Sequence, residues 1–172
     1  MTDFNLAIPQ LLEKLQLSLT EQLQQRAIVD PVMLGIHSGG VWIAQHLHQQ
    51  LGIQETLGVM DISFYRDDFS QIGMHPQVKP SHIPVSLEGR DIILVDDMFH
   101  TGRTVRAALN EVFDFGRPRQ VLLAVLIECN GRQIPLKPDC VGTVISLPAG
   151  TSIKLTGPEP LVIQIQSINA EE

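Results

Sequence analysis

Solid apolar runs that alternate with helical patterns are the feature that most constrains the fold of this chain. Residues 32–36, 91–96 and 120–127 are dominated by Val, Ile, Leu and other apolar residues, as buried strands are. Helical patterns follow two of these runs, at VWIAQHLHQQL and at residues 102–115. Strands with apolar interiors, separated by helices, predict an α/β fold in which a mostly parallel, twisted sheet is flanked by helices on both faces.

The remaining segments complete one domain. Residues 9–27 carry leucines at helical spacing and predict an amphipathic helix, and residues 56–65 predict a further strand. Residues 66–86 hold three prolines and no periodicity, which indicates a long surface loop. The last forty residues contain short β-like pieces and no clear helix, so we expect an edge strand and a small irregular lobe there. A chain of 172 residues is long enough for one domain with a substantial core.

Composition narrows the class of protein. The net charge is −7 and the pI is near 5.3, so the overall charge gives no support for a nucleic-acid partner. No apolar run reaches the about 18 residues of a transmembrane helix, and the start MTDFNLAIPQ lacks the features of a signal peptide. Cys129 and Cys140 have no C-x-x-C spacing, which favours a reduced pair over a disulfide or a metal site. We therefore expect a cytoplasmic protein without a membrane partner.

Two adjacent carboxylates, Asp96 and Asp97, directly follow the apolar run 92–95. In an open α/β sheet, ligands bind beyond the carboxyl ends of the strands, where these aspartates are expected. Two neighbouring carboxylates are costly to bury unless a cation or several hydrogen-bond donors face them. A sugar diol offers such donors, and Mg²⁺ offers charge.

A segment suited to phosphate follows the carboxylates. The loop that enters the predicted helix consists of Met98, Phe99, His100, Thr101, Gly102, Arg103 and Thr104. Free backbone N–H groups and the dipole at a helix N-terminus bind phosphate. Gly102 allows close approach of the backbone, and the hydroxyl of either Thr101 or Thr104 can cap the helix. Carboxylates for a ribose and a cradle for its phosphate therefore lie a few residues apart, which suits a ribose 5-phosphate.

A strand that ends in Asp-Asp also occurs in Walker-B-like sites, in phosphoacceptor domains and at solvated turns. The absence of G-x-x-x-x-G-K-[ST] from the sequence removes the P-loop interpretation. Asp-Asp followed by Thr-Gly-Arg-Thr at a helix start is more specific than Asp-Asp alone and favours a functional site. Trp42, early in a predicted helix, is interpreted as a core residue that could also line this site. His46 and His48 do not share a helix face, so we interpret them as surface residues rather than a metal pair.

The stretch ILVDDMFHTGRTVRAAL resembles the phosphoribosyl-pyrophosphate (PRPP) signature of type I phosphoribosyltransferases. With MDISFYRDDFS, the segment from IPVSLEGRD to VLLAVLI, and IPLKPDCVG, it is similar to the bifunctional pyrimidine-operon attenuator and uracil phosphoribosyltransferase family. The similarity covers most of residues 32–146. It implies a type I phosphoribosyltransferase-like fold in a single domain, residues 1–172, with a small hood lobe from about 128–172 plus the N-terminal segment. It also implies transfer of a phosphoribosyl group from PRPP to uracil, giving uridine monophosphate (UMP) and pyrophosphate.

The resemblance implies roles for individual residues in PRPP binding. Asp96 and Asp97 would hold the ribose hydroxyls, and residues 98–104 would wrap the 5-phosphate. Mg²⁺ would bind through PRPP, without a direct protein ligand. The place of the pyrophosphate loop is taken by His37, Ser38, Gly39 and Gly40.

Further roles concern catalysis and the nucleobase. Arg66 would start a loop, residues 66–82, that closes over the site, and it would act with Asp96 and Asp97 in catalysis by neutralising the departing pyrophosphate. A surface ion pair of Arg66 with a neighbouring aspartate is the alternative. The hood over the nucleobase would include Glu128, Arg132 and Val141.

The sequence departs from the family pattern at two places. The pyrophosphate loop has no arginine, and the hood segment has Cys129 and Gly131 where the family has an arginine and a histidine. Three hypotheses follow: a uracil phosphoribosyltransferase, an RNA-binding attenuator of pyrimidine genes with weak or no catalysis, and a transferase for another nucleobase. We expect binding of leader RNA to be weak or absent, because the chain has 12 basic residues against 19 acidic ones. The resemblance implies a homodimer or a higher oligomer.

Overall fold

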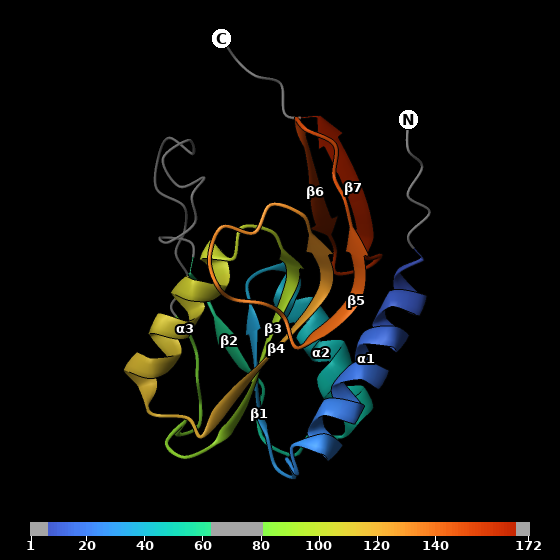
Figure 1. The fold of residues 1–172 in the computed structure, drawn as a ribbon. Helices are drawn as coiled ribbons and strands as arrows, with labels where there is room; N and C mark the ends of the chain where they lie inside the picture. The colour runs from blue at the N-terminus through green and yellow to red at the C-terminus, as the bar shows by residue number, and fades with distance from the viewer. Residues whose placement is uncertain (1–6, 63–80, 168–172) are drawn as a thin grey trace.

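The structure is a computed structural model and describes residues 7–62 and 81–167. Its centre is a five-stranded parallel sheet with the strand order β2-β1-β3-β4-β5, and a second, antiparallel sheet consists of β6 and β7 (Figure 1). In chain order, the elements are α1 (Ile8–Gln25), β1 (Val32–Ile36), α2 (Gly39–Leu51), β2 (Gly58–Met60), β3 (Asp91–Phe99), α3 (Arg103–Phe115), β4 (Gln120–Cys129), β5 (Cys140–Ile145), β6 (Thr151–Thr156) and β7 (Val162–Ser167). The predicted α/β architecture with a mostly parallel sheet is confirmed.

Three strands end at other places than the sequence predicts, and one of them is β4, which ends at Cys129 rather than at residue 127. β3 continues past Asp96 to Phe99, because the neighbouring strand β4 also continues and Phe99 pairs with Glu128. The predicted strand 56–65 is reduced to β2, which is an edge strand whose last residue, Met60, pairs with the last residue of β1, Ile36. Residues 63–65 of that prediction lie outside the described part of the chain.

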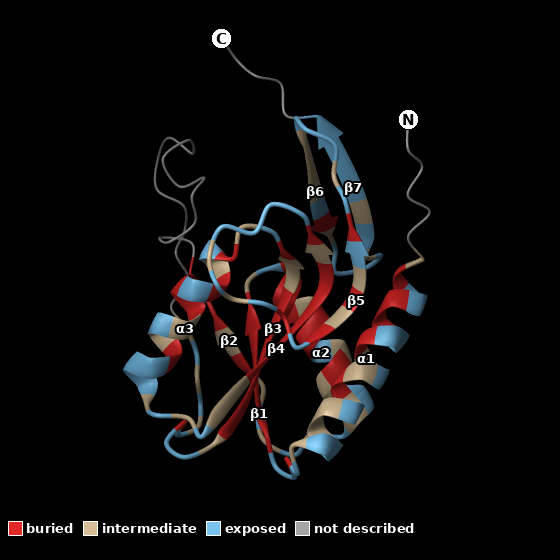
Figure 2. Ribbon diagram, in the orientation of Figure 1, coloured by how far each residue is buried: buried red, intermediate tan, exposed pale blue. Residues whose placement is uncertain are grey.

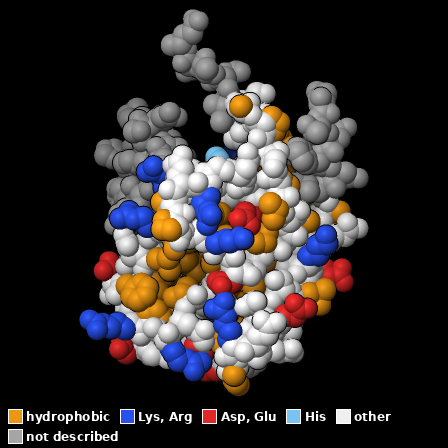
Figure 3. Space-filling model, in the orientation of Figure 1, with side chains coloured by type: hydrophobic (Ala, Val, Ile, Leu, Met, Phe, Trp, Pro, Cys, Tyr) orange, Lys and Arg blue, Asp and Glu red, His pale blue; other side chains and the backbone are white. Residues whose placement is uncertain are grey.

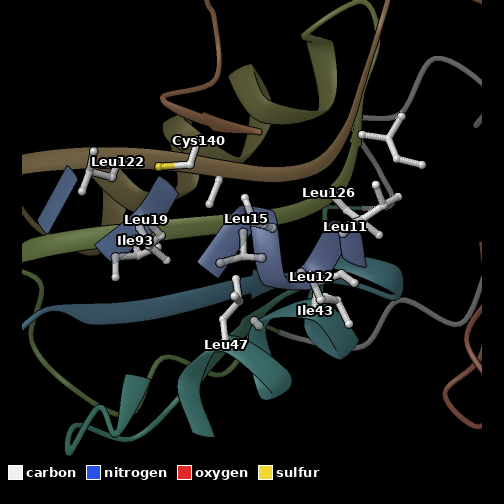
Figure 4. Packing of buried hydrophobic residues seen from close by; sticks show 14 of the residues in the cluster. Leu11, Leu12, Leu15, Leu19, Ile43, Leu47, Ile93, Leu122, Leu126 and Cys140 are labelled. Atoms are coloured by element: carbon white, nitrogen blue, oxygen red, sulfur yellow. The ribbon is translucent and has the colours of Figure 1, made fainter. Parts of the chain in front are cut away.

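Helices cover both faces of the sheet, so its strands are buried on both sides (Figure 2). On one face, α1 and α2 pack against alternate residues of the strands, including Ile93 and Leu122 (Figure 4). On the other face, α3 packs against the intervening residues, including Ile92 and Leu94. Leu15 of α1 is fully buried, and burial of such a side chain contributes about 1.5–3 kcal/mol to stability. This arrangement explains why the strands are continuous apolar runs rather than alternating ones.

The connections create a crevice at the centre of the sheet. From β1 the chain passes through α2 to β2 at one edge, and from β3 it passes through α3 to β4 toward the other edge. Because α2 and α3 lie on opposite faces, the loops after β1 and β3 diverge at the carboxyl ends of these neighbouring strands. Ligands of open α/β sheets bind at such a switch point.

The C-terminal lobe is a regular antiparallel ribbon, so its prediction as irregular was wrong. β6 and β7 pair from Thr151–Ser167 to Thr156–Val162, a contact that only the fold reveals because each strand alone is short. Leu155 is buried, and Ile153 and Ile163 pack against the core on the α1–α2 face. The ribbon rises beyond the carboxyl ends of the central strands (Figure 1). No helix in residues 7–62 or 81–167 is long and apolar enough to cross a membrane.

Candidate active site

The loop after β1 lies directly against the two carboxylates at the end of β3. A Cβ atom on Gly39 would lie 2.2 Å from Oδ2 of Asp97, and one on Gly40 would lie 2.6 Å from the carbonyl oxygen of Val95. Glycine is therefore required at both positions for this close approach. The structure thus joins two segments that the sequence separates by more than fifty residues.

The carboxylates themselves are held by backbone groups. Asp96 is 2% exposed and its Oδ1 accepts a hydrogen bond from the N–H of Asp97 at 2.9 Å. Asp97 is partly buried and its Oδ1 accepts a hydrogen bond from the N–H of Met98 at 3.0 Å. Within the described residues, no Lys or Arg side chain forms an ion pair with Asp97. The second oxygen of Asp97 is therefore placed to accept hydrogen bonds from a ligand in the crevice.

The segment after the carboxylates leads into the N-terminus of α3. Gly102 is the N-cap residue and has a φ of 92°, in the left-handed region that favours glycine. No side chain caps the helix, although the hydroxyl of Thr101 accepts a hydrogen bond from the N–H of Arg103 at 3.3 Å. The predicted capping by a threonine is thus wrong, because the left-handed glycine occupies the cap position. The absence of a side-chain cap leaves N–H groups of the first turn available to a phosphate.

Two adjoining hollows form the cleft above the sheet. The first, of about 460 Å³, is lined by Ser38, Gly39, Trp42, Asp97, Lys154, Leu155, Thr156 and Gly157. The second, of about 560 Å³, is lined by Asp96, Asp97, Met98, His100, Thr101, Thr104, Ser152, Ile153, Lys154 and Gln166. Asp97 and Lys154 belong to both. The cleft therefore connects the loop after β1, the carboxylate pair and the start of α3.

A third hollow has a different character. It has a volume of about 490 Å³ and lies along α3, with a lining that includes Leu109, Phe113 and Leu136. Hydrophobic side chains gather over α3 in the space-filling view (Figure 3). An anionic ligand suits the polar cleft at the strand ends better than this mostly apolar groove, whose described lining has Arg106 and Asn110 as its polar side chains and no glycine loop or helix N-terminus.

The residues from β6 and β7 were missed by the sequence analysis. Ser152 and Lys154 of β6 and Gln166 of β7 line the cleft, with Ser152 paired to Gln166 in the ribbon. The sequence pattern that could have indicated these strands is the alternation of polar and apolar residues in TSIKLT and VIQIQS, which is typical of strands with one apolar face. The alternation indicates a polar face but not what that face covers. Trp42 lines the cleft and also packs against the core, so both of its proposed roles are present.

The groups with shifted pKa values are structural. A hydrogen bond from Arg119, opposed by burial, lowers the pKa of Asp91 at the start of β3, the end of the strand away from the cleft. Burial raises the pKa values of Cys129 and Cys140 to about 11, so neither thiol is suited to act as a nucleophile at neutral pH. Within the described residues, no group of three or more His, Cys, Asp and Glu side chains could hold a metal ion.

The geometry agrees with comparisons to known proteins. The family model described as "Phosphoribosyl transferase domain" matches residues 6–154. The chain belongs to the phosphoribosyltransferase family. It is 48% identical over 158 residues to the "Bifunctional protein PyrR" of Pseudomonas fluorescens, a match that covers 92% of this chain and 94% of the relative. It is 49% identical over 170 residues to the protein of the same name from Nitrosococcus oceani, with 98% and 96% covered.

Solved structures show the same fold. A hypoxanthine-guanine phosphoribosyltransferase from Bacillus anthracis superposes with a TM-score of 0.68 at 20% identity, and the match covers 84% of this chain and 85% of that one. A purine phosphoribosyltransferase from Pyrococcus horikoshii gives a TM-score of 0.57 at 25% identity, with 79% and 82% covered. The predicted type I phosphoribosyltransferase-like fold is confirmed.

The predicted hood residues of this phosphoribosyltransferase lie apart from the two hollows. Arg66 and most of the predicted closing loop lie outside the described residues. Arg132 is exposed and donates to the carbonyl oxygen of Leu136 at 3.4 Å. Val141 packs against the core on the α3 face, and Glu128 pairs with Phe99 and Val144 near the end of β4. None of the three proposed hood residues lines either hollow, whereas the ribbon β6–β7 does.

The loop after β4 instead packs on residues 98–104, the segment predicted to bind the 5-phosphate. The N–H of Gln133 donates to the carbonyl oxygen of Thr101 at 3.0 Å, and Nε of Arg103 donates to the side chain of Gln133 at 3.2 Å. A Cβ atom on Gly131, which has a φ of 104°, would lie 2.7 Å from Nε2 of His100. This loop therefore supports residues 98–104 on the side away from the two hollows.

Proposed function

We propose that this phosphoribosyltransferase transfers the phosphoribosyl group of PRPP to uracil, giving UMP and pyrophosphate. The observation that carries the proposal is the contact of Gly39 with Asp97. With this contact, the glycine loop, the two carboxylates and the N-terminus of α3 surround one cleft. PRPP presents a diphosphate, a ribose diol and a 5-phosphate in that order. The similarity to proteins named Bifunctional protein PyrR supports uracil as the base, because the sequence resembles the attenuator and uracil phosphoribosyltransferase family over the same region.

Each subsite has a defined task in this reaction. Asp96 and Asp97 accept hydrogen bonds from the ribose hydroxyls, and the first turn of α3 with Thr101 and Thr104 binds the 5-phosphate. The ring nitrogen N1 of uracil then attacks C1′ of the ribose, the bond from C1′ to the diphosphate oxygen breaks with its electron pair, and N1 loses its proton. The ordered cleft holds the two reactants in line and limits capture of the ribose by water.

Mg²⁺ is part of the proposal. Mg²⁺ is usually held by substrate phosphates and water with few protein ligands, and here it would bind through PRPP, without a direct protein ligand. When bound with PRPP, the ion neutralises charge on the diphosphate. The residues that would face it are Asp96 and Asp97.

Pyrophosphate release from PRPP and Mg²⁺ with a panel of free bases tests the function. Uracil is expected to support turnover, and Asp97→Asn serves as a control that lacks the carboxylate. Turnover with hypoxanthine or guanine but not with uracil would favour a purine transferase. PRPP binding without turnover of any base would favour a nucleotide sensor.

The proposed partners beyond the substrates are a second copy of the chain and, with weak affinity, leader RNA. The RNA proposal rests on the resemblance and on the word "bifunctional" in the relatives' name, and it is opposed by the acidic composition. Filter binding of a pyrimidine-operon leader RNA across a salt series tests it. Tight, sequence-selective binding that UMP strengthens would place the attenuator hypothesis first.

Light scattering of the purified chain tests the proposed homo-oligomer.

A further inference from the structure

The cleft has an unusual charge balance for a site that binds a polyanion. Its described lining contains the two carboxylates Asp96 and Asp97, and one Lys or Arg side chain, that of Lys154. PRPP adds a 5-phosphate and a diphosphate, so the bound state brings several more negative charges into this space. Uncompensated charges in a partly desolvated site are costly. A protein cation beside the diphosphate would offset this cost.

Lys154 is free to serve as that cation. Within residues 7–62 and 81–167, no ion pair or hydrogen bond engages its ammonium group. Some other basic residues are engaged in ion pairs, for example Arg26 with Asp139 at 2.6 Å and Arg90 with Glu55 at 3.1 Å. The side chain of Lys154 is exposed at the border between the two hollows.

The ribbon holds Lys154 close to the loop after β1. Leu155, its neighbour in β6, is buried in the core and anchors the strand. Directly after β6, Gly157 packs on the ring of Trp42, where an added Cβ atom would lie 3.1 Å from Cε3. Trp42 belongs to α2, three residues after Gly39. The ribbon is thus fixed to the helix that the loop after β1 begins.

We propose that Lys154 binds the diphosphate of PRPP and stabilises the pyrophosphate as it leaves, an inference that rests on the proposed function. The diphosphate is favoured over the 5-phosphate for two reasons. The described lining of the hollow that Lys154 shares with Ser38 and Gly39 has backbone N–H groups but no other basic side chain. The 5-phosphate, in contrast, has the N-terminus of α3 and two threonines.

The chemical role follows from where charge develops. When the bond between C1′ and the diphosphate oxygen breaks, its electron pair stays on that oxygen and the leaving group gains negative charge. The ammonium group of Lys154 hydrogen-bonds to this oxygen or its neighbours more strongly as the charge grows, which lowers the barrier. The new bond from N1 of uracil to C1′ and the loss of the N1 proton do not involve Lys154.

Binding measurements without a base separate this inference from the choice of uracil. Calorimetry compares PRPP, pyrophosphate and ribose 5-phosphate, each with Mg²⁺, on wild-type protein, Lys154→Met, Lys154→Arg and Lys14→Met. Lys14 lies exposed on α1 and lines neither hollow, so Lys14→Met is a matched control for loss of one charge. Thermal melting checks that all variants fold.

Lys154→Met should weaken binding of PRPP and of pyrophosphate about 10–100-fold, the loss expected for one charge-assisted hydrogen bond. It should leave binding of ribose 5-phosphate within about 2-fold, because that ligand has no diphosphate. Lys154→Arg should restore most of the affinity, and Lys14→Met should behave as wild type. Unchanged pyrophosphate binding in Lys154→Met, or an equal loss for ribose 5-phosphate, would overturn the assignment. Tight PRPP binding through Lys154 with no turnover of uracil would instead overturn only the proposed base.

Discussion

Substitution of Gly39 by alanine tests whether the loop after β1 sets the position of the Asp97 carboxylate, to which we assign a role in PRPP binding and catalysis. The added Cβ atom would lie 2.2 Å from Oδ2, 2.5 Å from Cγ and 2.8 Å from Cβ of Asp97. Non-bonded carbon and oxygen atoms keep more than about 3 Å apart, so the carboxylate must move by about 1 Å. Rotation of the Asp97 side chain toward the cleft relieves the contacts with Oδ2 and Cγ, and a shift of the backbone by a few tenths of an ångström relieves the contact with Cβ. The fold should therefore survive the substitution.

The enzymatic activity of Gly39→Ala should fall much more than its thermal stability. A displacement of about 1 Å in an active site costs on the order of 100-fold in rate, which corresponds to about 2.7 kcal/mol of transition-state stabilisation. We therefore expect kcat/KM of Gly39→Ala to fall about 100-fold, with a melting temperature close to that of wild type. Steady-state kinetics of pyrophosphate release and a thermal melt measure the two quantities.

Two further variants serve as controls for Gly39→Ala. Gly40→Ala shows the effect of a clash with the backbone, and Gln45→Ala shows the effect of a substitution on the same helix without a clash. At Gly40 an added Cβ atom would meet backbone atoms, the carbonyl oxygen of Val95 at 2.6 Å and Cα of Asp96 at 2.9 Å, which cannot rotate away. This variant should lose about 1–3 kcal/mol of stability through overpacking. Gln45 is exposed on the same helix, and its substitution should change neither quantity. Wild-type kcat/KM in Gly39→Ala would refute the reasoning, because the carboxylate would then tolerate the displacement.

Three further outcomes follow from the same structure. Asp97→Asn should keep the fold and weaken PRPP binding by about 1.5–3 kcal/mol, the value of a charge-assisted hydrogen bond, and an unchanged affinity in calorimetry would contradict its assignment to the ribose. Asp91→Asn should destabilise the protein most above the unfolded pKa of about 3.9, because the hydrogen bond from Arg119 lowers the native pKa and the resulting stability is lost as the pH falls through that lower value. Urea unfolding between about pH 3 and pH 7 measures this difference, and a pH-independent difference would speak against the ion pair. Cys129 and Cys140, with pKa values raised to about 11, should be alkylated slowly in the native protein at about pH 8, where about one thiol in a thousand is ionised, and labelling as fast as in urea would contradict their burial.

The sequence alone determined the fold class and the part of the candidate site that is local in the chain. The run from Ile92 to Val95, the two aspartates and the start of α3 are contiguous, so strand, carboxylates and helix N-terminus could be predicted together. Apolar strands separated by helices also predicted a parallel sheet, because a strand that is buried on both faces consists of a continuous run of apolar residues.

Only the tertiary structure decided which distant residues lie next to the strand end, the two aspartates and the start of α3. β1 lies beside β3 in the sheet, and this strand order brings Gly39 against Asp97. The antiparallel pairing of β6 with β7 places Lys154 at the cleft, whereas Val141 belongs to the core. Such contacts depend on strand order, register and the direction of connections between distant segments. A local pattern of hydrophobicity indicates which face of an element is buried, but it contains no information on which distant element covers the other face.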